Sequence, residues 1–226
     1  MIGIIDYNAG NIKSVERALS YLGYTENEGY VLSKNPRDLE KADRIIFPGV
    51  GEAKYAMEQL KKSGFDHFLK DAAESKKPIL GICLGSQIIF EHSDEGDVEC
   101  LGLLKGRIEH FSTLFGKAGI EANKFKVPQI GFNDLTRKDK FKNDAIFEGV
   151  SENASFYFVH SYVIQAENED DVIATCDYGI KVPSAIKHGN IYAFQFHPEK
   201  SGESGLRMLK NFCTLQTTGS TGGSSC

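Results

Sequence analysis

A short apolar run that ends at a cysteine between two glycines most constrains how this chain can fold. Residues 79–82 are typical of a buried parallel strand, and apolar residues continue beyond Cys83 as a short helix. Gly81 and Gly85 allow a sharp turn, so Cys83 is expected on a strand-to-helix turn that exposes its side chain above the sheet. The start of a helix favours an anion, and therefore a thiolate. Free cysteine is also commonly buried as a small hydrophobe, so this stretch alone leaves both a nucleophile and a core residue open.

Strand-like and helix-like segments alternate through the first half of the chain. In the segment 12–22, apolar residues recur at three- and four-residue spacing, which gives a helix with one apolar face. Further helices are predicted at 52–62 and 65–75, and strands at 2–6, 30–32 and 44–47. This alternation predicts a parallel sheet with helices on both faces.

The pattern changes after about residue 91. An acidic loop is predicted at 93–99 and a last helix at 204–215. Between them helical periodicity is weak, and strand-like pieces are predicted at 106–111, 125–130, 155–162, 172–176, 182–187 and 191–196. We therefore predict an α/β fold of three layers: a mostly parallel central sheet with helices on both faces, and an antiparallel or mixed extension of that sheet.

Length and composition bound the class of protein. We predict a single domain over residues 1–216, and residues 217–226 have the composition of a flexible tail or a cloning remnant. The net charge is −5, basic residues are scattered and no apolar run is long enough to span a bilayer, so neither nucleic acid nor a membrane is expected as a partner. Met1 leads straight into a strand-like run, which predicts a cytoplasmic protein. The five cysteines form no C-x-x-C pair, so no disulfide framework and no metal site are expected.

A histidine and a glutamate follow the strand-like run at 191–196. Pro198 biases His197 away from the helical region, so His197 is held extended while Glu199 turns back toward it. Such a histidine can accept a proton from a cysteine elsewhere in the fold, and the carboxylate can fix its tautomer. On its own, this stretch is also compatible with an ordinary loop. Because Cys83 and His197 both lie at carboxyl ends of predicted strands, where ligands collect in parallel sheets, together they predict a catalytic pair.

The strand at 44–47 also ends in glycines, in Pro48-Gly49-Val50-Gly51. Glycines at this end of a strand mark a place where backbone approaches a ligand. No Gly-Lys-Ser or Gly-Lys-Thr follows, so this is not a phosphate loop.

In combination, three stretches resemble the class I glutamine amidotransferases: Pro48-Gly49-Val50-Gly51, Gly81-Ile82-Cys83-Leu84-Gly85-Ser86-Gln87 and Gln195-Phe196-His197-Pro198-Glu199. Four more narrow the resemblance to the glutaminase subunits of imidazole glycerol phosphate synthase, which feed ammonia to a (β/α)8 cyclase subunit in histidine biosynthesis. They are Ile5-Asp6-Tyr7 with Ala9-Gly10-Asn11, Val127-Pro128-Gln129-Ile130-Gly131, Phe158-Val159-His160-Ser161-Tyr162 and Lys200-Ser201-Gly202-Glu203. The resemblance runs from Ile2 to about Leu215.

This resemblance implies a catalytic triad. Cys83 would attack the side-chain amide of L-glutamine, His197 would act as general base and then acid, and Glu199 would orient His197. The resemblance further implies an oxyanion hole formed by the backbone N–H groups of Val50 and Leu84. It implies no cofactor and no metal.

The resemblance also implies substrate and partner contacts. The positions that would hold the amino acid end of glutamine are Gly51, Gln87, Glu95, Ser161 and Tyr162, and those at the interface with the cyclase subunit are Asn11 and Lys200. Read alone, Ser161 and Tyr162 are equally compatible with sheet packing, and Glu95 with a solvated charge. His160 has the alternative of an interior histidine and is left out of the catalytic set.

Several positions depart from the pattern of these subunits, mostly where they meet the cyclase: Asn8, Ala9, Ala53, Ser86, Gln129 and Phe132. Three alternatives therefore stay open. The chain could supply ammonia to a surface-sugar synthase, could be a non-catalytic scaffold subunit, or could be a γ-glutamyl hydrolase or cysteine peptidase that uses the same triad.

Overall fold

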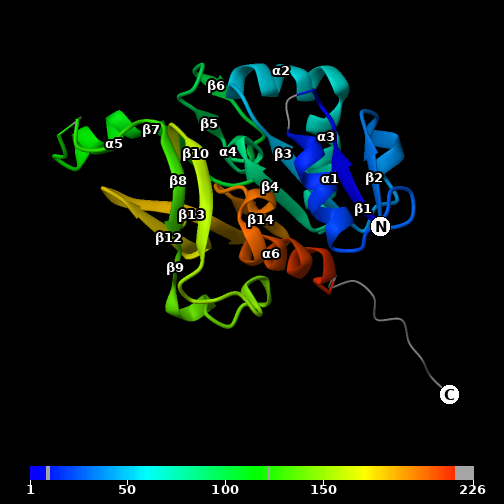
Figure 1. The fold of residues 1–226 in the computed structure, drawn as a ribbon. Helices are drawn as coiled ribbons and strands as arrows, with labels where there is room; N and C mark the ends of the chain where they lie inside the picture. The colour runs from blue at the N-terminus through cyan, green and yellow to red at the C-terminus, as the bar shows by residue number, and fades with distance from the viewer. Residues whose placement is uncertain (9–10, 122, 217–226) are drawn as a thin grey trace.

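The computed structural model describes residues 1–8, 11–121 and 123–216. Its centre is an eight-stranded sheet (Figure 1). In the order in which they lie side by side, the strands are β2 (Tyr30–Ser33), β1 (Ile2–Ile5), β3 (Arg44–Gly49), β4 (Ile79–Cys83), β14 (Ile191–Phe194), β13 (Ile180–His188), β12 (Val172–Tyr178) and β9 (Thr136–Arg137). The first five are parallel and the last three join them antiparallel, which confirms the predicted mixed sheet.

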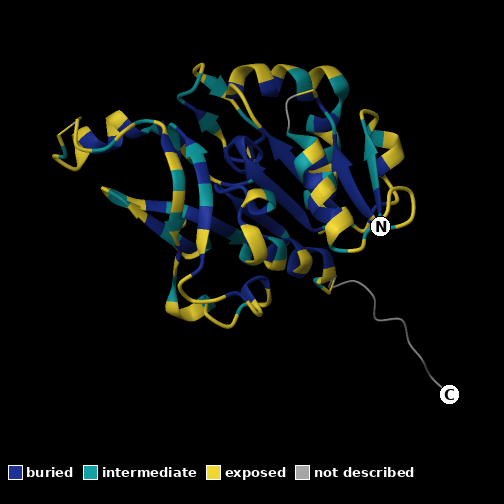
Figure 2. Cartoon of the chain, viewed as in Figure 1, coloured by how far each residue is buried: buried dark blue, intermediate teal, exposed yellow. Residues whose placement is uncertain are grey.

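Helices cover both faces of the parallel half, as predicted. The helices α1 (Ile12–Tyr21) and α6 (Gly202–Thr214) pack with one apolar cluster, and α2 (Ala53–Ser63) and α3 (Phe65–Glu74) with the other. Strand β3 contributes side chains to both clusters, because side chains alternate between the two faces of a sheet along a strand. Ile46 belongs to the first cluster, and Ile45 and Phe47 belong to the second. The central strands are buried on both faces, which explains their unbroken apolar runs (Figure 2).

The second half of the chain forms more than an extension of that sheet. An antiparallel ribbon pairs β8 (Gln129–Asp134) with β10 (Ser155–His160). A further small sheet has the order β11 (Tyr162–Ala166), β7 (Gly106–His110), β5 (His92–Ser93) and β6 (Val98–Glu99). The prediction that all later strands extend one sheet is therefore only partly correct.

Two strand predictions were wrong in this region, and one helix was not predicted. The single strand predicted at 155–162 breaks at Ser161, which divides it between the ribbon and the small sheet. The strand predicted at 125–130 begins only at Gln129, and β7 is followed by an unpredicted helix, α5 (Phe111–Lys117). The acidic loop at 93–99 is held between β5 and β6. The partners of these short strands, rather than their own sequences, decide where they begin and end.

The order of strands decides where chemistry can occur. Because β3, β4 and β14 are parallel neighbours, their carboxyl ends meet at one edge of the sheet. The glycine-rich turn after β3, Cys83 and His197 all leave the sheet at that edge. The described residues contain no helix long and apolar enough to cross a bilayer. The predicted tail, 217–226, lies outside the described residues.

Candidate active site

Cys83 ends β4 and stands directly before the five-residue helix α4 (Leu84–Ile88), as predicted. Its φ of 54° and ψ of −113° are rarely adopted by residues with a side chain. Two glycines make the turn possible: a Cβ on Gly85 would lie 2.1 Å from the carbonyl oxygen of Phe47, and one on Gly81 would lie 2.7 Å from the carbonyl oxygen of Gly85. The strand and helix therefore approach each other only because these positions lack side chains.

His197 follows β14 and is paired with Glu199, again as predicted. Its Nδ1 lies 2.7 Å from Oε1 of Glu199, and the backbone N–H of His197 donates to the carbonyl oxygen of Tyr157 at 2.9 Å. The two side chains are 2% and 1% exposed. Since Nδ1 faces a carboxylate, it carries a proton. The other ring nitrogen, Nε2, has no hydrogen-bond partner among the described residues and is left for chemistry.

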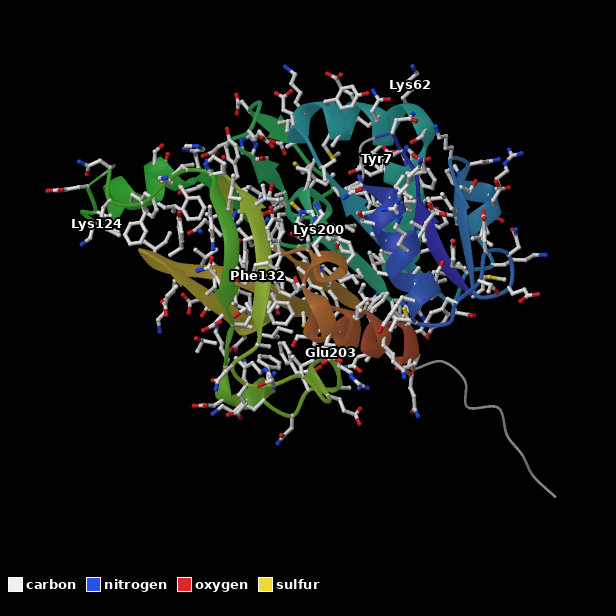
Figure 3. All side chains as sticks on the ribbon, viewed as in Figure 1. Tyr7, Lys62, Lys124, Phe132, Lys200 and Glu203 are labelled. Atoms are coloured by element: carbon white, nitrogen blue, oxygen red, sulfur yellow. The ribbon has the colours of Figure 1, made fainter. Side chains whose placement is uncertain are left out.

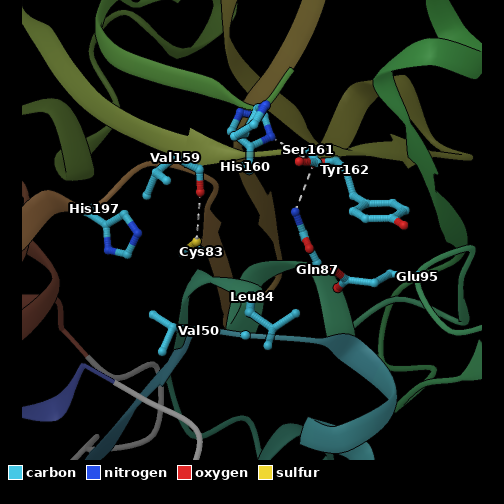
Figure 4. A pocket seen from close by; sticks show the side chains of 12 residues that line it. Val50, Cys83, Leu84, Gln87, Glu95, Val159, His160, Ser161, Tyr162 and His197 are labelled. Carbon is cyan, nitrogen blue, oxygen red and sulfur yellow. Dashed lines mark hydrogen bonds between the residues drawn. The ribbon is translucent and has the colours of Figure 1, made fainter. Parts of the chain in front are cut away.

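The environment of His197 changes its protonation. Burial by itself lowers the pKa of the imidazole, but the interactions with Cys83 and Glu199 outweigh it and raise the pKa from 6.5 to about 9. His197 is therefore an imidazolium beside the Cys83 sulfur at neutral pH (Figure 4). A group with this proton can donate to a leaving group at the site.

A cavity of about 300 Å³ opens at this point. Of the predicted site residues, it is lined by Val50, Gly51, Cys83, Leu84, Gln87, Glu95, Ser161, Tyr162 and His197 (Figure 4). Glu199 stands behind His197 instead of lining the cavity. The fold thus gathers in one place residues from five separate stretches of the sequence.

One end of the cavity carries hydrogen-bond acceptors. Oε2 of Glu95 accepts the backbone N–H of Ala53 at the start of α2, at 2.9 Å, so its carboxylate is not free in solvent. Burial raises the pKa of Glu95, the Ala53 hydrogen bond opposes that shift, and the charge of Glu52 adds to it. Gln87 is 4% exposed and reaches the same cavity. A ligand with a cationic end would relieve the crowding of negative charge here.

Three further residues line the cavity without having been predicted: Pro128, Val159 and His160. The carbonyl oxygen of Val159 lies 3.9 Å from Sγ of Cys83. The interior-histidine interpretation fits His160, which is 6% exposed and whose Nδ1–H donates to the carbonyl oxygen of Tyr162 at 2.7 Å. Burial lowers its pKa to about 4, so it stays neutral at neutral pH. All three lie within the stretches 127–131 and 158–162, which carry the family resemblance. That resemblance was the only feature of the sequence that could have indicated them.

The two predicted interface residues lie outside the cavity. Asn11 stands immediately before α1, and Lys200 is exposed with its Nζ 5.8 Å from the ring centre of Tyr157. Their role toward a partner stays a prediction. Among the described residues, no group of three or more His, Cys, Asp or Glu side chains is arranged to hold a metal ion.

Comparison with known proteins gives the family. A model of the family described as glutamine amidotransferase class-I matches residues 3–215. The fold resembles a solved glutamine amidotransferase with a TM-score of 0.68 and 19% identity, covering 93% of this chain and 98% of the other. It resembles PurLQS from Thermotoga maritima with a TM-score of 0.66 and 21% identity, over 93% and 96%. The chain therefore belongs to the class I glutamine amidotransferases.

Sequence relatives narrow this further. The chain is 40% identical over 216 residues to the imidazole glycerol phosphate synthase subunit HisH of Geobacillus sp. (strain WCH70), which covers 95% of this chain and 97% of the relative. It is 41% identical over 217 residues to subunit HisH 1 of Campylobacter jejuni subsp. jejuni serotype O:23/36 (strain 81-176), over 95% and 100%. Within its class, the chain belongs to the HisH family.

Proposed function

We propose that this protein hydrolyses L-glutamine to glutamate and ammonia with Cys83, His197 and Glu199, and delivers the ammonia to the cyclase subunit of imidazole glycerol phosphate synthase in histidine biosynthesis. The observation that carries the proposal is the pairing of His197 with Glu199 at 2.7 Å beside a cysteine on a strained turn that opens to a cavity. Family membership supports the same reaction.

The proposed reaction uses this geometry in two halves. The thiolate of Cys83 attacks the side-chain amide carbon of glutamine, and the resulting oxyanion is held by the backbone N–H groups of Val50 and Leu84. The carbon–nitrogen bond then breaks, and His197 gives its proton to the nitrogen, which leaves as ammonia. A water molecule, deprotonated by the now neutral His197, attacks the thioester. The carbon–sulfur bond breaks, glutamate leaves, the second proton of the water passes to solvent, and Cys83 returns to the thiolate beside protonated His197. Glu199 keeps the imidazole oriented in both halves through Nδ1.

The cavity provides for the amino acid end of the substrate. We assign Glu95 and the carboxamide oxygen of Gln87 as acceptors for its ammonium group, and Ser161, Tyr162 and Gly51, which line the same cavity, as donors to its carboxylate. These assignments extend the catalytic proposal to a zwitterionic substrate.

A partner surface is proposed beside the cavity, on the outer face of the ribbon. Ile130 and Phe132 on β8 are 62% and 60% exposed, and Val50 is 37% exposed. Tyr157 pairs with Phe132 across the ribbon, with ring centres 5.5 Å apart, and Nζ of Lys200 lies over the Tyr157 ring. Phe132 and Lys200 lie near each other in Figure 3. Exposed large apolar side chains of this kind mark an interface. Ammonia could then pass to the partner without being protonated in bulk water.

The first experiment measures glutamate release from L-glutamine by the chain alone, and together with an imidazole glycerol phosphate synthase cyclase subunit and its nucleotide substrate. Cys83→Ala should abolish release, whereas Cys100→Ala, which changes a cysteine outside the cavity, should not. Stimulation by the cyclase that is lost in Cys83→Ala supports both chemistry and partner. Release that depends on Cys83 without stimulation would point to another synthase, such as one for surface sugars. No release in any mixture would favour a non-catalytic scaffold.

A second pair of variants addresses the partner surface. Phe132→Asp should weaken stimulation by the cyclase and leave release by the isolated chain unchanged. Tyr21→Asp is the matched control, since Tyr21 is 79% exposed and is the last residue of α1, outside the cavity. If the cyclase stimulates Phe132→Asp as strongly as it stimulates Tyr21→Asp and the parent, the ribbon face is excluded as the docking surface.

A further inference from the structure

The hydrogen bonds of Gln87 permit only one orientation of its carboxamide. Its Nε2 donates to the main-chain carbonyl oxygen of Tyr162 at 2.9 Å and to Oε1 of Gln195 at 2.8 Å. A carbonyl oxygen can only accept, so the Gln87 atom that faces it must be the nitrogen. Both hydrogens of that nitrogen are then used. The oxygen of Gln87 is the atom left to face the cavity that the residue lines (Figure 4).

Gln195 supplies half of this arrangement from outside the cavity. It is fully buried just after β14, two residues before His197, and its backbone N–H donates to the carbonyl oxygen of Ser184 at 2.9 Å. Its own Nε2 has no partner among the described residues. A buried amide with an unsatisfied N–H group costs stability that an apolar side chain of the same length would not. The polar side chain is therefore better explained by what its oxygen does for Gln87 than by packing.

The direction of the Gln87 oxygen matters for the substrate. The ammonium group of an amino acid has three N–H donors and no acceptor. With its oxygen toward the cavity, Gln87 offers a second acceptor beside the carboxylate of Glu95. If the carboxamide were rotated by 180°, its NH₂ group would face the ammonium group instead. Both groups donate hydrogen bonds, so no hydrogen bond could form between them.

We propose that Gln195 is a positioning residue that determines specificity: together with the main-chain carbonyl oxygen of Tyr162, it holds the carboxamide oxygen of Gln87 toward the cavity, so that the site selects amides with a protonated α-amino group. This inference rests on the proposed glutaminase function, because it concerns how the same site recognises glutamine. Gln195 touches no substrate itself and acts through Gln87.

The test compares two ligands on a chain that cannot turn them over. In the Cys83→Ala background, calorimetry measures the affinity for L-glutamine and for 4-carbamoylbutanoate, which is glutamine without its amino group. Gln195→Met keeps the length of the side chain and removes the acceptor; Gln195→Glu keeps an acceptor oxygen. Gln129→Met is the matched control, because Gln129 is equally buried and lies outside the cavity.

We expect the parent to prefer L-glutamine, and Gln195→Met to reduce that preference by about threefold to tenfold, the range for one lost neutral hydrogen bond, because the carbonyl oxygen of Tyr162 still accepts from the Gln87 nitrogen. The affinity for 4-carbamoylbutanoate should change little, Gln195→Glu should restore the preference, and Gln129→Met should keep it. An unchanged preference in Gln195→Met, an equal loss for both ligands, or no preference in the parent would overturn the inference. Glutamate release by the unaltered chain tests the glutaminase function separately, so the two failures are distinguishable.

Discussion

The pKa of His197, which Cys83 and Glu199 together raise, gives a quantitative prediction about stability against pH. The folded chain raises the pKa of His197 from 6.5 to about 9, so between these values the folded state binds a proton that the unfolded state has lost. The contribution to the free energy of unfolding is therefore fully present below pH 6.5 and is lost as pH rises through about 9. Its size is about 3 kcal/mol, from 1.36 kcal/mol for each pH unit of the difference.

Glu199→Gln removes the negative charge and keeps an oxygen that can accept from Nδ1 of His197. Replacing a hydrogen bond to a charged group with a neutral one costs about 1 kcal/mol, which lowers the pKa of His197 by roughly one pH unit. The new NH₂ group adds a penalty at every pH, because Oε2 of Glu199 is buried without a partner among the described residues. Relative to the parent, the variant should therefore be about 1 kcal/mol more destabilised at pH 6 than at pH 10.

Urea unfolding of both proteins, followed by circular dichroism from pH 6 to pH 10, measures this difference. Comparing the two proteins cancels groups that titrate equally in both, such as the buried thiols. Glu203→Gln is the matched control, since Glu203 is exposed on the same segment of the chain. Nuclear magnetic resonance of the imidazole gives the pKa of His197 directly. The reasoning is refuted if the destabilisation by Glu199→Gln is the same at pH 6 and pH 10, or if His197 titrates near 6.5.

Further predictions concern packing and binding. Gly85→Ala should destabilise the chain by at least about 3 kcal/mol in urea, because its Cβ would lie 2.1 Å from a backbone oxygen, whereas Gly116→Ala, with open space in α5, should stabilise it by up to about 1 kcal/mol. As the pH is lowered, the affinity for L-glutamine should begin to fall while the pH is still above 4.5, because burial raises the pKa of the Glu95 carboxyl and the carboxylate is protonated early. Glu95→Gln should remove this pH dependence in a binding titration. The ring of His160 should show no titration in magnetic resonance spectra between pH 5 and pH 8. Because its pKa of about 4 is below the unfolded value of 6.5, His160 should cost stability as pH falls between them.

Where local chemistry suffices, the sequence predicted the structure. The turn at Cys83 was predictable because an apolar run, a cysteine and flanking glycines leave few conformations open to the backbone. The extended His197 beside Glu199 followed similarly from the restriction that Pro198 imposes. The parallel half of the sheet was predictable because strands buried on both faces carry continuous apolar runs.

Where partners are distant, the sequence was silent or wrong. The strand predicted at 155–162 broke at Ser161 because β10 and β11 pair with different strands, β8 and β7. The solvated charge considered for Glu95 became a hydrogen-bonded carboxylate only because Ala53, 42 positions away, offers an N–H group.

By itself, the sequence determined the local geometry of each reactive residue, since backbone restrictions act over a few neighbours. Only the tertiary structure decided that these residues share one cavity, because that depends on which strands lie side by side. It also decided the orientation of Gln87, whose hydrogen bonds reach 75 and 108 positions along the chain to Tyr162 and Gln195. Contacts over such separations form only when the whole sheet has assembled, so no local pattern records them.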